Sequence, residues 1–156
     1  MGIEPLPKLT PTAPPLVPGN DWQQLWFSAV QHGWSSLAIV PAQPGISSLE
    51  AARMFAAAGR LYHQRPVHLI EAETTDPTTT SFVISSAANR VAAGEQVIIA
   101  VDSPLSHPAA IPLARAADAA LLLVPLGRTG LVAAHRTIDC VGRQHFIGSI
   151  TLRTPI

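Results

Sequence analysis

Short runs of consecutive apolar residues alternate along this chain with longer segments whose apolar residues recur at helical spacing. Continuous apolar runs lie within residues 37–40, 96–102 and 119–124, and apolar segments with polar interruptions lie at residues 67–71 and 145–152. A run without polar interruptions is typical of a parallel strand buried on both faces. The amphipathic segments lie at residues 21–32, 47–59, 82–93, 111–117 and 131–141. This alternation predicts an α/β fold, with a doubly wound, mainly parallel sheet of about five strands and helices on both faces.

The first strand–turn–helix unit spans residues 36–59. Its turn, Pro41–Gly45, can continue neither a strand nor a helix. Ser47 with Glu50 three residues later is the pattern of a capping box, so we expect the helix to begin there. The amides at the start of such a helix attract anions. A phosphate-binding loop, however, has the pattern G-x-x-x-x-G-K-S/T, and this turn has one glycine and no lysine.

The missing lysine leaves two interpretations of this unit. The only lysine of the chain, Lys8, precedes every predicted element. The unit is therefore either a phosphate-binding frame without its cation or an ordinary strand–helix unit that binds nothing.

Carboxylates follow two of the predicted strands. Glu71 and Glu73 end the second, and Asp102 ends the third. The carboxyl ends of parallel strands share the edge at which open α/β sheets bind ligands. We therefore expect Glu71 and Asp102 to cluster there with Gly45 and Ser47. Glu71 and Glu73 could form a metal-binding pair, but two solvated glutamates at the start of a polar loop are the favoured interpretation.

Composition predicts a single α/β domain over residues 20–156. The chain has 156 residues, 47% of them apolar, enough for one ordinary core. Residues 1–19 are rich in proline and predict a flexible leader, with a strap that docks on a neighbour as the alternative. Ten basic and ten acidic residues cancel, which argues against nucleic-acid binding. A single cysteine, Cys140, and the lack of a signal segment or a long apolar run predict a cytoplasmic protein without membrane insertion.

Three smaller sets of residues carry candidate roles. Trp22 and Trp26 share the apolar face of the first predicted helix, where they are either core anchors or a partner-binding surface. Asp102, Ser103 and His107 could do nucleophilic chemistry, but they are close only in sequence, which does not make a triad. The six histidines do not have the spacing of a metal site.

Several segments, taken in order, resemble one family. Residues 97–104, VIIAVDSP, are similar to the "viiDsPP" strand of MinD/ParA-type P-loop ATPases, and more narrowly to the ATPase-like domain of bacterial tyrosine kinases that act with polysaccharide co-polymerases. Residues 116–129 resemble the "aaDgvllVvr.grT" segment of that family, and residues 145–152 resemble ".viGvvln". Residues 67–73 align with "VLLIDaD" and residues 36–52 with the phosphate loop and its helix. The resemblance covers about residues 21 to 152 and implies a P-loop NTPase-like fold.

The chain departs from this family at the positions that carry the chemistry. Gly45-Ile46-Ser47-Ser48 stands where the family has its lysine and Ser/Thr, and Glu71-Ala72-Glu73 replaces D-x-D. Asp102 is retained, whereas the C-terminal tyrosine cluster is absent and Tyr62 is the only tyrosine. Phosphoryl transfer depends on positioning and on electrostatic stabilisation of the transferred group. The resemblance therefore implies a degenerate ATPase without catalytic or metal-binding residues.

These departures lead to one functional expectation and one alternative. We expect a non-catalytic pseudo-ATPase that regulates or connects components of bacterial exopolysaccharide or capsule biosynthesis. Its partners would be a membrane polysaccharide co-polymerase or an active kinase paralogue, which would recruit it to the inner face of the membrane, and it could form homo-oligomers. No cofactor is expected, and Gly45, Ser47, Ser48 and Asp102 would be a vestigial cofactor site. The alternative is a slow ATPase that still binds ATP or ADP with Mg²⁺.

Overall fold

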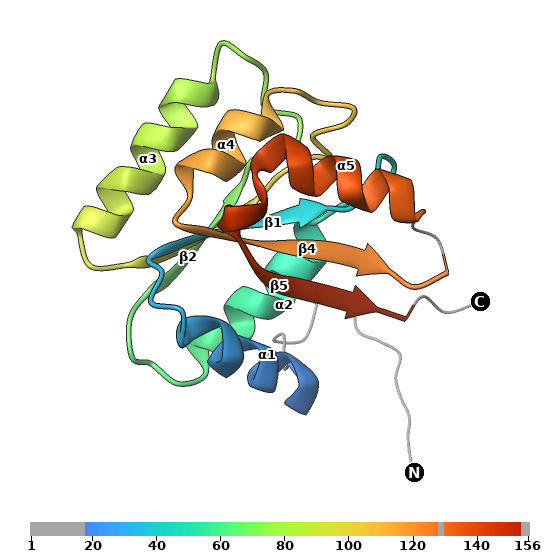
Figure 1. Ribbon diagram of the computed structural model, residues 1–156. Coiled ribbons are helices and arrows are strands. Elements are labelled where there is room, and N and C mark those ends of the chain that lie inside the picture. Colours follow the sequence, from blue (N-terminus) through green and yellow to red (C-terminus); the bar gives the residue numbers. More distant parts are fainter. Residues whose placement is uncertain (1–17, 128–129, 154–156) are drawn as a thin grey trace, which may run out of the picture.

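The computed structural model describes residues 18–127 and 130–153, which form five parallel strands and the helices that connect them. The sheet has the order β2-β3-β1-β4-β5 (Figure 1). This arrangement confirms the predicted α/β class and is consistent with a doubly wound, P-loop-like fold. The elements are α1 (Asn20–Val30), β1 (Ser36–Pro41), α2 (Leu49–Arg60), β2 (Val67–Glu71), α3 (Thr80–Ala92), β3 (Gln96–Ala100), α4 (Ala110–Ala116), β4 (Ala119–Pro125), α5 (Leu131–Val141), a 3₁₀ turn η1 (Arg143–His145) and β5 (Phe146–Leu152).

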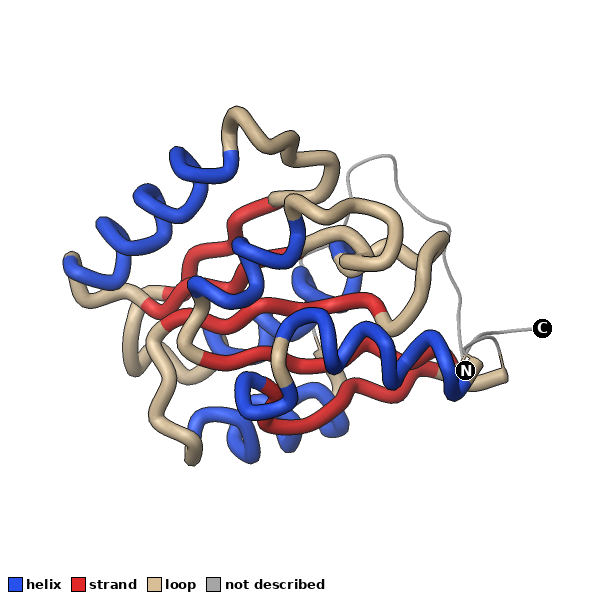
Figure 2. The backbone as a smooth tube through the Cα atoms, turned by 45° about the horizontal axis from the view of Figure 1, so that its top comes forward, coloured by secondary structure: helices blue, strands red, loops and turns tan. Residues whose placement is uncertain are grey.

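Helices cover both faces of the sheet, which explains why its central strands are apolar throughout. α1 and α2 lie on one face, and α3, α4 and α5 lie on the other (Figures 1 and 2). In β1, Leu37 and Ile39 belong to the core under α1 and α2, whereas Ala38 and Val40 belong to the core under the other three helices. All four side chains are fully buried. A strand covered on both sides cannot alternate apolar with polar residues.

The connections of the sheet diverge to its two borders from the central strands. β1 is central and pairs with β3 on one side and β4 on the other, as in Leu37↔Ile98 and Leu37↔Ala119. The chain leaves β1 through α2 to the distant border strand β2, and it leaves β4 through α5 to the opposite border strand β5. Ligands of open α/β sheets bind beyond the carboxyl ends of strands where connections diverge in this way. The turn after β1 is therefore the place to look for a site.

A cluster of aromatic rings fixes α1 on α2. Trp26 is 3% exposed, and its ring centroid lies 5.6 Å from that of Trp34 and 4.9 Å from that of Phe55. The Trp34 indole N–H is satisfied by the carbonyl of Ala29 at 2.9 Å. Gly59 of α2 lies under the Trp26 ring: a Cβ there would meet ring atom Cζ3 at 2.6 Å and two other ring atoms closer still. The absence of a side chain at Gly59 thus permits the close approach of the two helices.

The start of α3 differs from the prediction because Asp76 organises the turn before it. The helix begins at Thr80, two residues before the predicted start. The hydroxyl of Thr78 donates to the Asp76 carboxylate at 2.6 Å, and that of Thr79 donates at 3.1 Å. The backbone N–H groups of both threonines donate to the same oxygen at 3.0 Å. These hydrogen bonds lower the pKa of Asp76, because they stabilise its charged form.

Two sequence predictions bear on the parts of the chain around this domain. The proline-rich leader was expected over residues 1–19. Residues 1–17 of it, including Lys8, lie outside the described residues. Across the described ranges, none of the helices combines the length and the apolarity needed to cross a bilayer.

Candidate functional site

Three of the predicted site residues meet at the carboxyl edge of the sheet. Gly45, Ser47 and Asp102 line one cavity of about 310 Å³. Glu73 and Thr74, from the loop after β2, line it as well. Its remaining lining residues are Ile46, Ser103, Ser106 and His107. The fourth predicted cofactor residue, Ser48, is fully buried directly beside it, at the start of α2.

The carboxylate of Glu73 occupies the N-terminal end of α2. Its Oε2 atom accepts a hydrogen bond from the backbone N–H of Ser48 at 2.8 Å. The hydroxyl of Ser47 donates to the same carboxylate, with distances of 2.9 and 3.0 Å to its two oxygens. The first turn of a helix carries unpaired N–H groups and a partial positive charge, to which anions bind. A side chain of the protein itself therefore fills the position in which a strand–turn–helix unit would hold a phosphate.

The predicted capping box of Ser47 and Glu50 is confirmed only in its first half: the Ser47 hydroxyl accepts the N–H of Leu49, the first residue of α2, at 3.2 Å. The residue before the helix is Ser48, and its side chain makes no capping bond. The Ser48 hydroxyl instead donates to the carbonyl of Val101 at 2.7 Å, which holds the start of α2 against the end of β3. Glu50 pairs with Arg53 at 3.5 Å on the surface. The N–H of Ser48 is capped by Glu73, a residue distant in sequence, which a local pattern cannot reveal.

Asp102 is held by the same loop that carries Glu73. Its Oδ2 atom accepts a hydrogen bond from the backbone N–H of Thr74. Thr74 has φ of 63°, in the left-handed region that residues with a Cβ rarely adopt. The loop thus places two consecutive residues against two different elements, Glu73 against α2 and Thr74 against the end of β3. Both carboxylates of the cavity are engaged in bonds that close the edge of the sheet.

Glu71 does not join the other predicted residues. As the last residue of β2 it pairs with Arg53 of α2, with an N–O distance of 3.7 Å between two largely exposed side chains. Glu73 reaches the cavity in its place, because β2 ends at Glu71 and the following turn carries Glu73 to the start of α2. The two glutamates therefore do not form a metal-binding pair. Among residues 18–127 and 130–153, no group of three or more His, Cys, Asp or Glu side chains is placed to hold a metal ion.

The charge of the cavity does not suit an anionic ligand. Among the residues that the structure describes, its titratable lining residues are Glu73, Asp102 and His107, and neither arginine nor lysine lines it. The triphosphate of a nucleotide would meet two carboxylates at this edge. Ser47 and Ser48 could contribute their N–H and hydroxyl groups to an anion only after Glu73 had moved away.

The side chains of Asp102, Ser103 and His107 lie together but do not form a nucleophilic relay. The His107 Nδ1 atom lies 3.0 Å from the hydroxyl of Ser106, not of Ser103. Ser103 uses its own hydroxyl to accept the backbone N–H of Leu105 at 3.2 Å. A relay requires the base to contact the nucleophile and the acid to orient the base. These residues build a turn after β3.

The two candidate partner-binding tryptophans have different surroundings. Trp26 is a core residue, as described above, so the core-anchor interpretation applies to it. Trp22 is half-buried and lines a hollow of about 470 Å³ between α1 and β5. Leu25, Ile150 and Leu152 contribute apolar surface to the same hollow.

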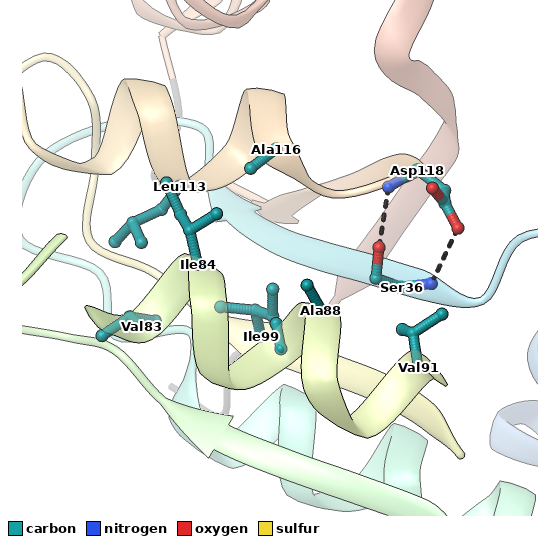
Figure 3. A pocket seen from close by; sticks show the side chains of 10 residues that line it. Ser36, Val83, Ile84, Ala88, Val91, Ile99, Leu113, Ala116 and Asp118 are labelled. Carbon is teal, nitrogen blue, oxygen red and sulfur yellow. Dashed lines mark hydrogen bonds between the residues drawn. The ribbon is translucent and has the colours of Figure 1, made fainter. Parts of the chain in front are cut away.

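Another pocket lies between α3 and α4, toward the amino ends of the strands (Figure 3). It measures about 210 Å³. Two residues at one end of it join β1 to β4: Asp118 accepts the backbone N–H of Ser36 at 3.1 Å, and the Ser36 hydroxyl accepts the N–H of Asp118 at 2.9 Å (Figure 3). The rest of the lining is apolar, with small residues where the helices face each other: Val83, Ile84, Ala87, Ala88, Val91, Ile99, Leu113 and Ala116. The sequence did not indicate this cavity, although its alanines are the signal that could have done so.

Comparison with known proteins adds no relative to this description. The chain matches none of the models of known protein families, and no curated protein matches it.

Proposed function

We propose that this protein is a non-catalytic pseudo-ATPase that acts through protein partners. One observation carries the proposal: Glu73 closes the N-terminal end of α2, the position of the phosphates in a nucleotide-binding unit of this shape. The sequence adds that no lysine lies in the turn Pro41–Gly45. A nucleotide would have to displace a carboxylate that makes several hydrogen bonds, and the described lining of the cavity offers no arginine or lysine in return.

The magnitudes favour an empty nucleotide site. An exposed helix N-terminus stabilises a bound negative charge by about 0.3–1 kcal/mol. Micromolar affinity requires about 8 kcal/mol of binding free energy. The described residues that line the cavity next to Ser47 include neither arginine nor lysine, and Asp102 and Glu73 oppose a phosphate there.

The biological setting of the proposal rests on the family resemblance. The kinases that the chain resembles act with polysaccharide co-polymerases. We accordingly propose a regulator or adaptor in bacterial exopolysaccharide or capsule biosynthesis, located in the cytoplasm and recruited to the inner face of the membrane. Its partner would be the cytoplasmic part of a co-polymerase or an active kinase paralogue.

Isothermal titration with ATP and Mg²⁺ tests the proposal. The expected result is no binding at micromolar affinity, together with no ATP hydrolysis or tyrosine phosphorylation above background. Glu73→Ala shows whether the carboxylate alone prevents binding, and Glu50→Gln, which removes a charge from the same first turn, is its matched control. A low-micromolar dissociation constant for the unaltered protein, lost on Asp102→Ala, would overturn the proposal. The protein would then be a slow ATPase that uses ATP or ADP with Mg²⁺.

A further inference from the structure

The two borders of the sheet differ in their protection against pairing with another strand. β2, at one border, has five residues, carries His68 and Glu71 and follows Pro66. β5, at the other border, has seven residues and contains neither a charged side chain nor a proline. Border strands of natural proteins are commonly short, charged or interrupted by proline, because open strand edges pair with other chains. Within the part of the chain that the structure describes, no strand pairs with the outer side of β5.

The backbone groups of Ser149 and Thr151 face this open side. The carbonyl of Leu152 accepts the N–H of Leu126 at 2.7 Å, so the backbone groups of Leu152 face β4. Successive residues of a strand direct these groups to opposite sides. The N–H and C=O of Thr151, and of Ser149 two residues earlier, therefore face away from β4. The pairing of β5 with β4 is regular from Gly148 to Leu152, so this part of the strand is straight enough to accept a second neighbour.

A hollow with an apolar floor runs beside the same part of β5, and Asp21, Thr151 and Arg153 complete its lining. It is the space of about 470 Å³ between α1 and β5. Trp22 and Leu25 of α1 and Ile150 and Leu152 of β5 line it. A strand added at this border would place side chains in the hollow, next to Trp22, Leu25 and Leu152, which the domain leaves half-buried.

We propose that β5 is the dimerisation strand of this protein, and that its partner is the β5 strand of a second copy. The two strands run antiparallel about a twofold axis at Ile150, so that one sheet continues across both copies. In this register Ser149 exchanges both backbone hydrogen bonds with Thr151 of the partner subunit, and their hydroxyl side chains are neighbours. Gly148, which is exposed, lies opposite Leu152 of the partner subunit. Ser–Thr and apolar cross-strand pairs of this kind stabilise antiparallel strands.

A second copy is the occupant that this strand fits best. A twofold interface brings the same surface of both copies together, and the register about Ile150 is complementary to itself. β5 contributes no charge to the contact. The chain has ten basic and ten acidic residues, so two copies do not repel each other through net charge.

Sedimentation velocity of the full chain over a series of concentrations tests this inference. The expected species has twice the 16.5 kDa mass of one chain. Ser149→Pro removes an outward N–H, and Thr151→Lys places a charge beside the axis. Both changes spare the ladder with β4 and should abolish the dimer. The dimer should persist in Ser149→Thr, and in Ser85→Lys, which adds the same charge on the exposed face of α3.

Several results would overturn the inference. One is a monomer at every concentration; another is a dimer that Ser149→Pro and Thr151→Lys leave intact while circular dichroism shows both variants folded. Hydrogen exchange should protect the amides of Ser149 and Thr151 in the dimer only. Protection in a monomer would mean that another part of the same chain covers β5, and a monomer that pairs with an extended peptide of another protein would assign the strand to that partner. None of these results depends on ATP, because β5 contributes no residue to the cavity beside Glu73.

Discussion

The carboxylate of Glu73 lies 2.8 Å from the backbone nitrogen of Ser48, so a loop that follows β2 closes the first turn of the helix that follows β1. This bond joins two connections that meet only in the folded protein. It places a carboxylate where an anion would otherwise bind at the start of α2.

Removing this carboxylate should destabilise the domain. Glu73→Ala leaves the N–H of Ser48 without its acceptor, and Glu73→Gln keeps an acceptor without the charge. We expect Glu73→Ala to lower the free energy of unfolding by about 1–2 kcal/mol, the usual cost of a lost helix cap, and Glu73→Gln to cost less. Urea unfolding measures both. Glu50→Gln should cost no more than about 0.5 kcal/mol, because its exposed pair with Arg53 contributes little; equal losses at both positions would contradict the role given to Glu73.

Gly59→Ala should destabilise the contact between α1 and α2. Alanine favours a helix by about 1 kcal/mol over glycine, but the new methyl group would collide with the ring of Trp26. Overpacking of this kind costs about 1–3 kcal/mol, so a net loss of stability is expected. The loss should shrink in the background of Trp26→Leu, which removes the ring. A double-mutant cycle of unfolding free energies measures this coupling, and additive effects would show that the ring is not the cause.

The protein should become less stable as the pH is lowered through the range where His68 titrates. Burial lowers the pKa of His68, and the positive charge of Arg90 lowers it further, while Glu95 opposes them. The unfolded chain therefore binds a proton at a higher pH than the native protein does. The free energy of unfolding should decrease as pH falls below about 6.5 and level off below the native pKa. Urea unfolding at successive pH values should show this slope reduced in His68→Gln and retained in His32→Gln, which alters an exposed histidine.

The bond pair between Ser36 and Asp118 should hold the starts of β1 and β4 together. Asp118 Oδ2 accepts the N–H groups of Ser35 at 2.8 Å and of Ser36 at 3.1 Å. Asp118→Ala removes the one acceptor of both N–H groups and should cost about 1–3 kcal/mol, whereas Asp118→Asn keeps an oxygen in place and should cost less. Hydrogen exchange at Ser35 and Ser36 reports the loss directly. Unchanged protection in Asp118→Ala would show that these amides do not need the side chain.

The fold was predictable from sequence because its signals are local. Each residue of a buried run such as Leu37–Val40 is apolar because helices cover both faces of β1. The same holds for β3 and β4. Element ends were less accurate where a side chain reorganises the backbone, as Asp76 does before α3.

The site was predictable only in part, because its decisive contacts cross between loops. Gly45, Ser47 and Asp102 follow strands whose carboxyl ends share an edge, and strand direction alone brings them together. Which glutamate reaches them depends on where β2 ends and on the turn at Thr74, whose left-handed backbone no sequence pattern indicated. The spacing of residues in the sequence therefore could not predict that Glu73, and not Glu71, lines the cavity.

The position of β1 at the centre of the sheet has a consequence for folding during synthesis on the ribosome. β1 is the first strand to leave the ribosome, but both strands that pair with it, β3 and β4, are synthesised much later. Its contacts are of long range in sequence, as in the bond that joins Ser35 to Asp118, 83 residues away. Sheets of this kind fold slowly. Until the partner strands are synthesised, unpaired apolar strands can aggregate with other chains or bind chaperones. A nascent chain that ends before Ala119 must therefore keep the segment Leu37–Val40 unpaired on one side, and the domain can close only when nearly all of it has been made.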